Sequence, residues 1–190
     1  MAALMQDGAA VEFASAFHAD KEVMLQAVTR DGWALNFSAW SLRADKELVL
    51  AAVKSQGTML RCADAELRAD RSIVLEAVRS NGFALQYADE ALKADREVVM
   101  QAVRSRGTAL GFAAATLRAD RSVVLLAVSN EGDALEYADT VLRNDKEVVT
   151  AAAHEWISSI RMAGDSILAD ESFIGDLLRG VPADRLANCR

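Results

Sequence analysis

Apolar residues along the chain fall into short groups whose members are three to four positions apart, the spacing of one helix face. Residues 70–94 contain two such groups. The first group is Ile73, Val74, Ala77 and Val78. The second is Ala84, Leu85, Tyr87, Ala88 and Leu92. The groups lack the alternation of a strand, and alanine is frequent at their packing positions, so the pattern predicts two short helices.

The same pattern returns every 25 residues, which is the signature of a repeat protein. Four columns of identical or similar residues keep this step. The aspartate column is Asp20, Asp45, Asp70, Asp95, Asp120, Asp145 and Asp170, and the glycine column is Gly32, Gly57, Gly82, Gly107 and Gly132. An alanine column contains Ala27, Ala52, Ala77, Ala102, Ala127 and Ala152, and a leucine column contains Leu35, Leu60, Leu85, Leu110 and Leu135.

Each column has a predicted structural role. The aspartate is placed to cap the first helix, because its carboxylate can accept hydrogen bonds from the free amides of the first turn. The glycine follows about ten helical residues later, where a left-handed residue would end the helix. Helices this short are marginal alone, so their stability must come from stacking of the copies. We therefore expect an all-α fold, an α-solenoid of helix-turn-helix repeats that forms a curved rod.

The repeat sets the expected organisation of residues 1–190 as a single domain. Residues 1–19 are expected to form a partial N-terminal copy, with Gly8 in the glycine column, and residues 20–169 form six full copies. Residues 170–190 are expected to form a C-terminal cap with a last short helix that begins near Pro182. In the sixth copy Ile157 replaces the glycine, so the first helix there is expected to run further or to turn differently. Trp156, Met162 and Phe173 would belong to the closing cap.

One motif describes the copies: D-(K/R)-(E/S)-x-V-x-x-A-V-x-x-x-G-x-A-L-x-(F/Y)-A-x-x-x-L-(R/K). It resembles the repeat family known as domain of unknown function 4116, over roughly residues 8–179. In that family one domain spans about two of these units, and the domains occur in tandem arrays. The resemblance implies a helical repeat and supplies no catalytic residues.

Two basic columns are candidates for a partner-binding surface. The first lies in the first turn of each long helix, where a cation opposes the helix dipole: Lys21, Lys46, Arg71, Arg96, Arg121 and Lys146. The second ends each second helix: Arg43, Arg68, Lys93, Arg118 and Arg143. These cations could form a basic ribbon for an acidic partner, or they could pair with the aspartate column and with neighbouring glutamates. Such exposed pairs are common and individually weak.

Positions that differ between copies indicate the outward surface. Just after the glycine stand Trp33, Thr58, Phe83, Thr108 and Asp133, and further on Trp40, Ala65, Glu90, Ala115 and Thr140. An aromatic residue where other copies have threonine or aspartate is expected to be partly exposed. Trp33, Trp40 and Phe83 are therefore candidate anchors for a partner. The alternative is that Trp33 and Trp40 cover the open end of the stack.

Composition narrows the remaining possibilities. The net charge of −7 opposes general nucleic-acid binding, which needs a basic footprint. No apolar run is long enough for a membrane span, and the first residues lack a secretory pattern, so an intracellular location is expected. Cys62 and Cys189 are too few for a disulfide framework, and Cys62 is expected to be a small core residue. His18 and His154 lack ligand-spaced companions, and adjacent aspartates of the column would stand too far apart to share an ion, so no metal or cofactor is expected.

These observations favour a non-catalytic protein–protein interaction module, or a structural subunit of a larger assembly. Its partners would be other protein subunits, and its oligomeric state is left open. The first alternative is a helical repeat that reads nucleic acid with one side chain per copy, as some helical repeats do. The second is the non-catalytic repeat part of a larger enzyme or effector. No catalytic motif is present to support an enzyme.

Overall fold

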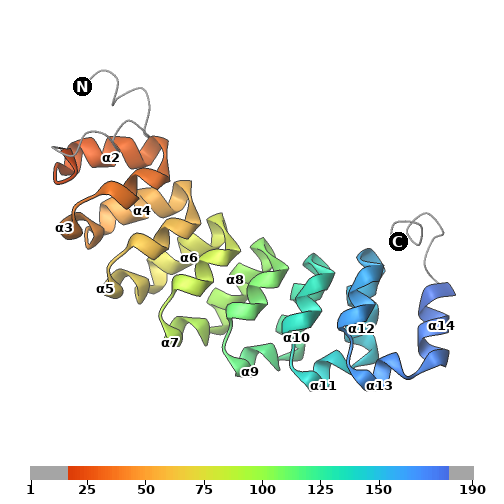
Figure 1. Cartoon of the computed structure of the whole chain (residues 1–190). Coiled ribbons are helices and arrows are strands. Elements are labelled where there is room, and N and C mark those ends of the chain that lie inside the picture. The colour runs from red at the N-terminus through yellow and green to blue at the C-terminus, as the bar shows by residue number, and fades with distance from the viewer. Residues whose placement is uncertain (1–16, 180–190) are drawn as a thin grey trace. The chain divides into compact units, whose positions relative to one another are not determined.

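The computed structural model describes residues 17–179, and every regular element within them is a helix (Figure 1). Gly8 and the helix expected near Pro182 lie outside the described residues. The chain divides into two compact units between Ser105 and Arg106, and each is described by itself. Short 3₁₀ helices are labelled η below.

The first unit contains three complete copies of the repeat and the long helix of a fourth. Its elements are α2 (Lys21–Arg30), η3 (Gly32–Phe37), α3 (Trp40–Arg43), α4 (Lys46–Ser55), η4 (Gly57–Cys62), α5 (Ala65–Arg68), α6 (Arg71–Ser80), η5 (Gly82–Tyr87), α7 (Glu90–Lys93) and α8 (Arg96–Ser105). The long helices α2, α4, α6 and α8 pack in chain order, and η3, η4 and η5 form a second row beside them. Each 3₁₀ segment also packs on the long helix of the next copy.

The second unit continues the same order of elements. It contains η6 (Gly107–Phe112), α9 (Ala115–Arg118), α10 (Arg121–Asn130), η7 (Gly132–Tyr137), α11 (Thr140–Arg143), α12 (Lys146–Glu155), η8 (Ile157–Met162), α13 (Asp165–Leu168) and α14 (Glu171–Arg179). Helices α10 and α12 pack side by side, and η6, η7 and η8 form the neighbouring row. Both units are therefore solenoid-like stacks of 25-residue helical repeats, as the sequence predicts, and residues 17–179 contain no strand.

The core lies between the two rows of helices and consists of the predicted apolar columns. In the third copy Ile73, Val74, Ala77 and Val78 have no exposed surface, and the same is true of Ala84 and Leu85. Burial of each large aliphatic side chain contributes about 1.5–3 kcal/mol. Helix α6 packs on α4 and η4 of the preceding copy and on α8 of the following one, so the stack supplies the stability that the short helices lack alone.

The prediction of a single second helix in each copy is wrong, because a 3₁₀ segment and a separate short helix stand in its place. In the third copy the 3₁₀ segment η5 ends at Tyr87, and Ala88 is extended, with φ −68° and ψ 155°. The next amide, that of Asp89, donates to the carbonyl oxygen of Arg68 in the preceding copy at 3.0 Å before α7 begins. Asp64 and Asp139 make the same bond to Arg43 and Arg118. A hydrogen bond to the neighbouring copy therefore interrupts the helix, where the local sequence has no breaking residue.

The glycine column does not end the long helices in the left-handed conformation, because no described residue has a positive φ. In the third copy Asn81 ends α6 in an extended conformation, and its amide donates to the carbonyl oxygen of Ala77. Glycine is needed for close approach instead. A Cβ atom on Gly57 would lie 2.1 Å from the carbonyl oxygen of Ala77, one copy further along. The Gly57 amide also donates to Oγ of Ser80 in that copy, at 3.1 Å.

The sixth copy keeps the regular geometry despite Ile157, so the expected longer or differently turned helix is wrong. Helix α12 has the same ten-residue length as the earlier long helices, and η8 follows Trp156. In the next helix, no residue of α14 is fully buried, and α14 packs chiefly on α13.

We expect Gly57→Ala to destabilise the first unit strongly. Its Cβ would overlap the Ala77 carbonyl oxygen, which is backbone and cannot move without shifting α6. Overpacking of this kind costs about 1–3 kcal/mol or more. The free energy of unfolding, measured by urea titration of the whole chain, would report the loss. Gly175→Ala is the matched control: the nearest atoms lie 3.7 Å away at the Arg179 guanidinium, and alanine is a better helix former. An equal loss in both variants would contradict the close-approach account.

Candidate functional site: a charged row and an exposed tryptophan pair

The aspartate column caps the long helices as predicted. Asp70 Oδ1 accepts hydrogen bonds from the amides of Ser72 at 2.8 Å and Ile73 at 3.3 Å, at the start of α6. Asp20, Asp120 and Asp145 cap α2, α10 and α12 through the equivalent two amides. Because Oδ1 serves the helix, the second carboxylate oxygen of each aspartate remains for another contact.

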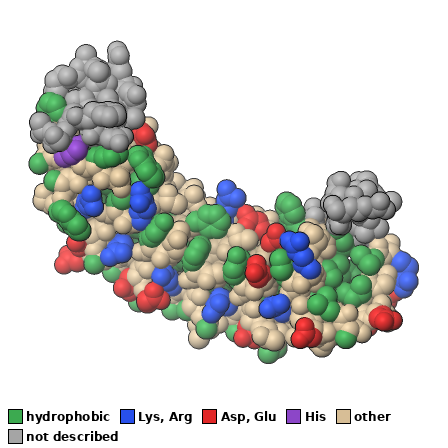
Figure 2. All heavy atoms as spheres, in the orientation of Figure 1, with side chains coloured by type: hydrophobic (Ala, Val, Ile, Leu, Met, Phe, Trp, Pro, Cys, Tyr) green, Lys and Arg blue, Asp and Glu red, His purple; other side chains and the backbone are tan. Residues whose placement is uncertain are grey.

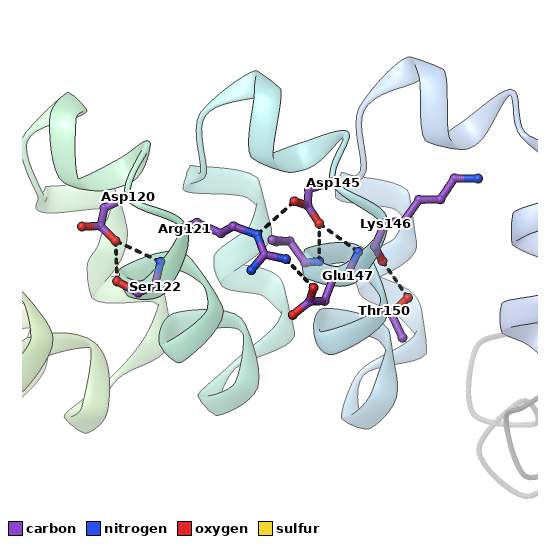
Figure 3. A network of polar contacts seen from close by, with 8 residues as sticks. Asp120, Arg121, Ser122, Asp145, Lys146, Glu147 and Thr150 are labelled. Atoms are coloured by element: carbon purple, nitrogen blue, oxygen red, sulfur yellow. Dashed lines mark hydrogen bonds and ion pairs between the residues drawn. The ribbon is translucent and has the colours of Figure 1, made fainter.

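That second oxygen binds the basic residue of the preceding copy. Lys46 Nζ lies 2.6 Å from Asp70 Oδ2, and Arg71 Nε lies 2.9 Å from Asp95 Oδ2. Lys21, Arg121 and Lys146 contact Asp45, Asp145 and Asp170 in the same way. Figure 3 shows Arg121 reaching from α10 to both acidic residues at the start of α12. For these five cations the geometry follows the interpretation in which the basic column pairs with the aspartate column.

Arg96, also a predicted site residue, lies with its Nη1 atom 3.2 Å from the sulfur of Met100 in its own helix. On the face seen in Figure 2, basic and acidic side chains are interspersed over both units, without a patch of one sign. The predicted basic ribbon is therefore a row in which basic and acidic side chains alternate, at the copies whose ion pairs are described.

The ion pairs alternate with a period of two copies. In the first, third and fifth copies the cation contacts a second carboxylate as well as the aspartate: Lys21 contacts Glu47, Arg71 contacts Glu97, and Arg121 contacts Glu147. In the second and sixth copies Lys46 and Lys146 have one described carboxylate each. The glutamate position that would face them is Ser72 or Ser172. In the links whose ion pairs are described, two successive copies therefore form a 50-residue unit: its inner link has one more ion pair than the outer links that follow Lys46 and Lys146.

These contacts shift the ionisation of the aspartates. The ammonium group of Lys46, which donates to the Asp70 carboxylate, is the main cause of a pKa well below the usual range, and Ser72 adds to the effect. The hydrogen bond from Lys21 lowers the pKa of Asp45, and that from Arg71 lowers the pKa of Asp95. The side chains of the cations are about half exposed, so solvent screening keeps each pair weak.

The second basic column has a role that sequence reasoning missed. Arg43 Nε donates to the carbonyl oxygen of Ser38 at 3.2 Å, and its Nη2 donates to that of Asn36 at 3.0 Å. Arg143 Nε donates to the carbonyl oxygen of Met162 at 2.7 Å. These arginines satisfy carbonyl groups at the end of a 3₁₀ segment. The recurrence of a basic residue at the end of each short helix could have indicated a structural role. The carbonyl groups that accept its hydrogen bonds can be identified only from the structure.

The tryptophan pair, Trp33 and Trp40, is exposed in the first copy. Trp33 is 46% exposed at the start of η3, and Trp40 is 80% exposed at the start of α3. The Arg61 guanidinium lies 4.8 Å from the centre of the Trp33 ring, and that of Arg43 lies 5.2 Å from the centre of the Trp40 ring. Phe83, the third predicted anchor, lies in η5 of the third copy and is partly buried. The structure thus exposes the two tryptophans as expected and places Phe83 apart from them along the chain.

Other candidate chemistry has no support within the described residues. Residues 17–179 contain no group of three His, Cys, Asp or Glu side chains that could hold a metal ion. Cys62 is buried in the core, as expected of a small packing residue. None of the described helices has the length and apolar character needed to cross a lipid bilayer.

We expect the free energy of unfolding to fall as the pH falls below about 3.8, the ordinary aspartate pKa. The paired aspartates have lower pKa values in the folded chain, so the unfolded chain takes up protons first and gains stability on acidification. Asp70→Asn should reduce this fall, and at neutral pH it should lose about 0.2–1 kcal/mol. Asparagine still caps helices, so the variant isolates the ion pair.

Asp20→Asn is the control for that experiment, because Asp20 caps α2 but has no ion pair among the contacts of the described residues. Urea titrations at several pH values would measure both variants. If Asp20→Asn changed the pH dependence as much as Asp70→Asn, the ion pairs between copies would not be its source.

Comparison with known proteins agrees with the 50-residue unit. A search of curated proteins and a search of solved structures each gave no significant match. One family model matches three times, over residues 20–68, 70–118 and 120–168, and carries the description "Domain of unknown function (DUF4116)". Each match covers two copies, an odd-numbered one followed by an even-numbered one, which are the copies joined by the doubled ion pairs. The chain therefore belongs to the DUF4116 family, with three tandem domains.

Proposed function

We propose that the chain is a non-catalytic protein–protein interaction module, or a structural subunit of a protein assembly, and that the tryptophan pair is part of its contact surface. The observation that carries this proposal is the 80% exposure of Trp40 beside the half-exposed Trp33. Tryptophan is the residue type most enriched among side chains that dominate binding energy at protein interfaces, and arginine is close behind it.

The surroundings of the pair support this use. Arg61 stacks on Trp33 and donates to Oδ1 of Asn36 at 3.2 Å, and the backbone amide of Trp33 donates to Asp31. Arg43 stacks on Trp40 while its guanidinium is held by backbone carbonyls. Cation–π contacts of this kind contribute about 0.5–1 kcal/mol at exposed sites. Rings held in place before binding lose less freedom when a partner covers them.

Two observations favour a protein partner over nucleic acid. The first is the pairing of Lys21, Lys46, Arg71, Arg121 and Lys146 with carboxylates of the next copy. A paired cation releases fewer counterions when it meets a phosphate backbone. The second is the net charge of −7, which repels a polyanion. A protein partner would not be repelled in this way by an exposed aromatic surface that has arginine neighbours.

A photo-crosslinking experiment tests the proposal. A photoreactive phenylalanine derivative replaces Trp40 in the full chain. The variant is expressed in cells of the organism that naturally produces the protein, and the cells are irradiated. We expect one or a few discrete protein adducts, identified by mass spectrometry. Trp33→Ala in the same chain should reduce their yield at least tenfold, which corresponds to about 1.4 kcal/mol of lost binding energy.

The matched control places the same photoreactive residue at Leu168, which is 44% exposed on the corresponding short helix of the sixth copy. Circular dichroism would establish that both variants retain their helical content. Failure to form any adduct at position 40, or an identical set of adducts at positions 40 and 168, would rule out a specific contact at the tryptophan pair.

A further inference from the structure

The second residue of each long helix alternates between two residue types from the second copy onward. It follows the capping aspartate by two positions, so it lies in the first turn of the helix. The residue is glutamate in the second, fourth and sixth copies, and serine in the third and fifth copies and in α14: Glu47, Ser72, Glu97, Ser122, Glu147 and Ser172. All six side chains are exposed. The alternation therefore compares a carboxylate with a hydroxyl group at one place in the repeat.

The glutamates at this position form a second ion pair with the preceding copy. Lys21 Nζ lies 2.9 Å from Glu47 Oε2, and Arg71 Nη2 lies 2.5 Å from Glu97 Oε2. In both links the same cation also contacts the capping aspartate, so two carboxylates share one cation. Two neighbouring anions are therefore compatible with this position when a cation lies between them.

At Ser72 the cation of the preceding copy is retained, but the serine supplies no anion. Lys46 Nζ contacts Asp70 Oδ2 at 2.6 Å, as the cations of the other links contact their aspartates. The Ser72 hydroxyl group donates to Asp70 Oδ1 at 2.6 Å, within its own copy. Figure 3 shows the same serine–aspartate contact in the second unit, between Ser122 and Asp120. The serine thus occupies the position of the glutamate without forming its ion pair.

A phosphate group on Ser72 would supply that anion. Its terminal oxygen atoms stand the same number of bonds from Cβ as the carboxylate oxygens of glutamate, so they have a similar reach. A phosphate carries close to two negative charges and three acceptor oxygens. It is favoured at the start of the ten-residue helix α6, where the helix dipole is positive. Asp70 Oδ1 would lose the hydroxyl donor and keep the amides of Ser72 and Ile73.

Ser72 and Ser122 share the same preceding residues. The sequence Leu-Arg-Ala-Asp-Arg-Ser forms residues 67–72 and again residues 117–122. An enzyme that recognises one of these exposed serines from the residues before it would therefore recognise the other. Ser172 differs, because Glu171 stands where the other two serines have an arginine before them. The pattern singles out Ser72 and Ser122 among the three serines of this column.

We propose that Ser72 and Ser122 are phosphorylation sites, and that the phosphate on Ser72 binds Lys46 as the glutamates bind the cations of their own links. A serine kinase and ATP are the co-reactants. Oγ forms a bond to the γ-phosphorus while the bond from that phosphorus to the β,γ-bridging oxygen breaks. ADP leaves, and the hydroxyl proton passes to a base of the kinase.

The modification would convert a link with one described ion pair into a link with two. Lys46 belongs to the first 50-residue domain of the family and Ser72 to the second, so the phosphate would fasten these two neighbouring domains to each other. This inference goes beyond the proposed function and does not depend on the tryptophan pair. It assigns to the serine copies a contact that phosphorylation can add or remove.

The first experiment tests whether the two serines are modified. The full chain is purified, in the presence of phosphatase inhibitors, from cells of the organism that naturally produces it, and its peptides are analysed by mass spectrometry. We expect phosphate on Ser72 and on Ser122. Absence of phosphate from either serine would overturn the proposal.

The second experiment tests the contact with Lys46. Phosphoserine is incorporated at position 72 of the full chain during translation, and its ³¹P NMR signal is followed as the pH is varied. The ammonium group of Lys46 and the guanidinium of Arg71 favour the doubly charged phosphate, whereas the Asp70 carboxylate opposes it. Lys46→Gln removes one of these cations and should raise the midpoint of the titration by about half a pH unit.

Lys146→Gln is the matched control, because Lys146 forms the equivalent single ion pair with Asp170 in the second unit. This variant should leave the midpoint unchanged. Both lysines are more than half exposed, and circular dichroism would establish that both variants keep their helical content. An unchanged midpoint in Lys46→Gln, or equal shifts in the two variants, would overturn the assignment of Lys46 as the cation that binds the phosphate.

Discussion

The close approach of each glycine to the long helix of the next copy is the constraint on which the other contacts depend. Where Gly57, Gly107 and Gly132 stand, a Cβ atom would lie within 2.1–2.6 Å of the alanine carbonyl one copy further along. This distance brings the Gly57 amide within reach of Ser80 and the Asp70 carboxylate within reach of Lys46. In the sixth copy Ile157 stands in the glycine column, and no residue of the following helix α14 is fully buried. The core and the row of ion pairs both depend on this spacing.

The close spacing of the copies divides the repeat positions into two classes, those that face a neighbouring copy and those that face outward. Residues that face the next copy are nearly constant, because a change there is felt by two copies at once. Residues at the start of the 3₁₀ segments and short helices face outward, and they range from Trp33 to Asp133 without disturbing the stack. The tryptophan pair is such an outward variation on a constant scaffold. A repeat of this kind can acquire a contact surface in one copy while its neighbours keep a plain one.

The sequence was sufficient for features that depend on one copy alone. The period, the aspartate caps, the apolar columns and the burial of Cys62 could all be predicted, because each follows from local spacing or propensity. The break after Tyr87, the reason for the glycines and the acceptors of Arg43 and Arg143 could not. Each of these is set by an atom of an adjoining copy or segment. For the candidate site, exposure of Trp33 and Trp40 could be inferred from their variable columns, whereas the stacking of Arg61 and Arg43 on the two rings could not, because it depends on the fold.

The alternation of the ion pairs has a consequence for how such an array changes length. Loss or duplication of 50 residues would bring an even-numbered copy against an odd-numbered one again, so every cation would meet the same set of carboxylates as before. Loss of 25 residues would leave the core columns in register but would set two odd-numbered copies side by side, where Arg71 would face Ser122 in place of Glu97. Genetic gain and loss in this chain would therefore be expected to proceed in steps of whole domains.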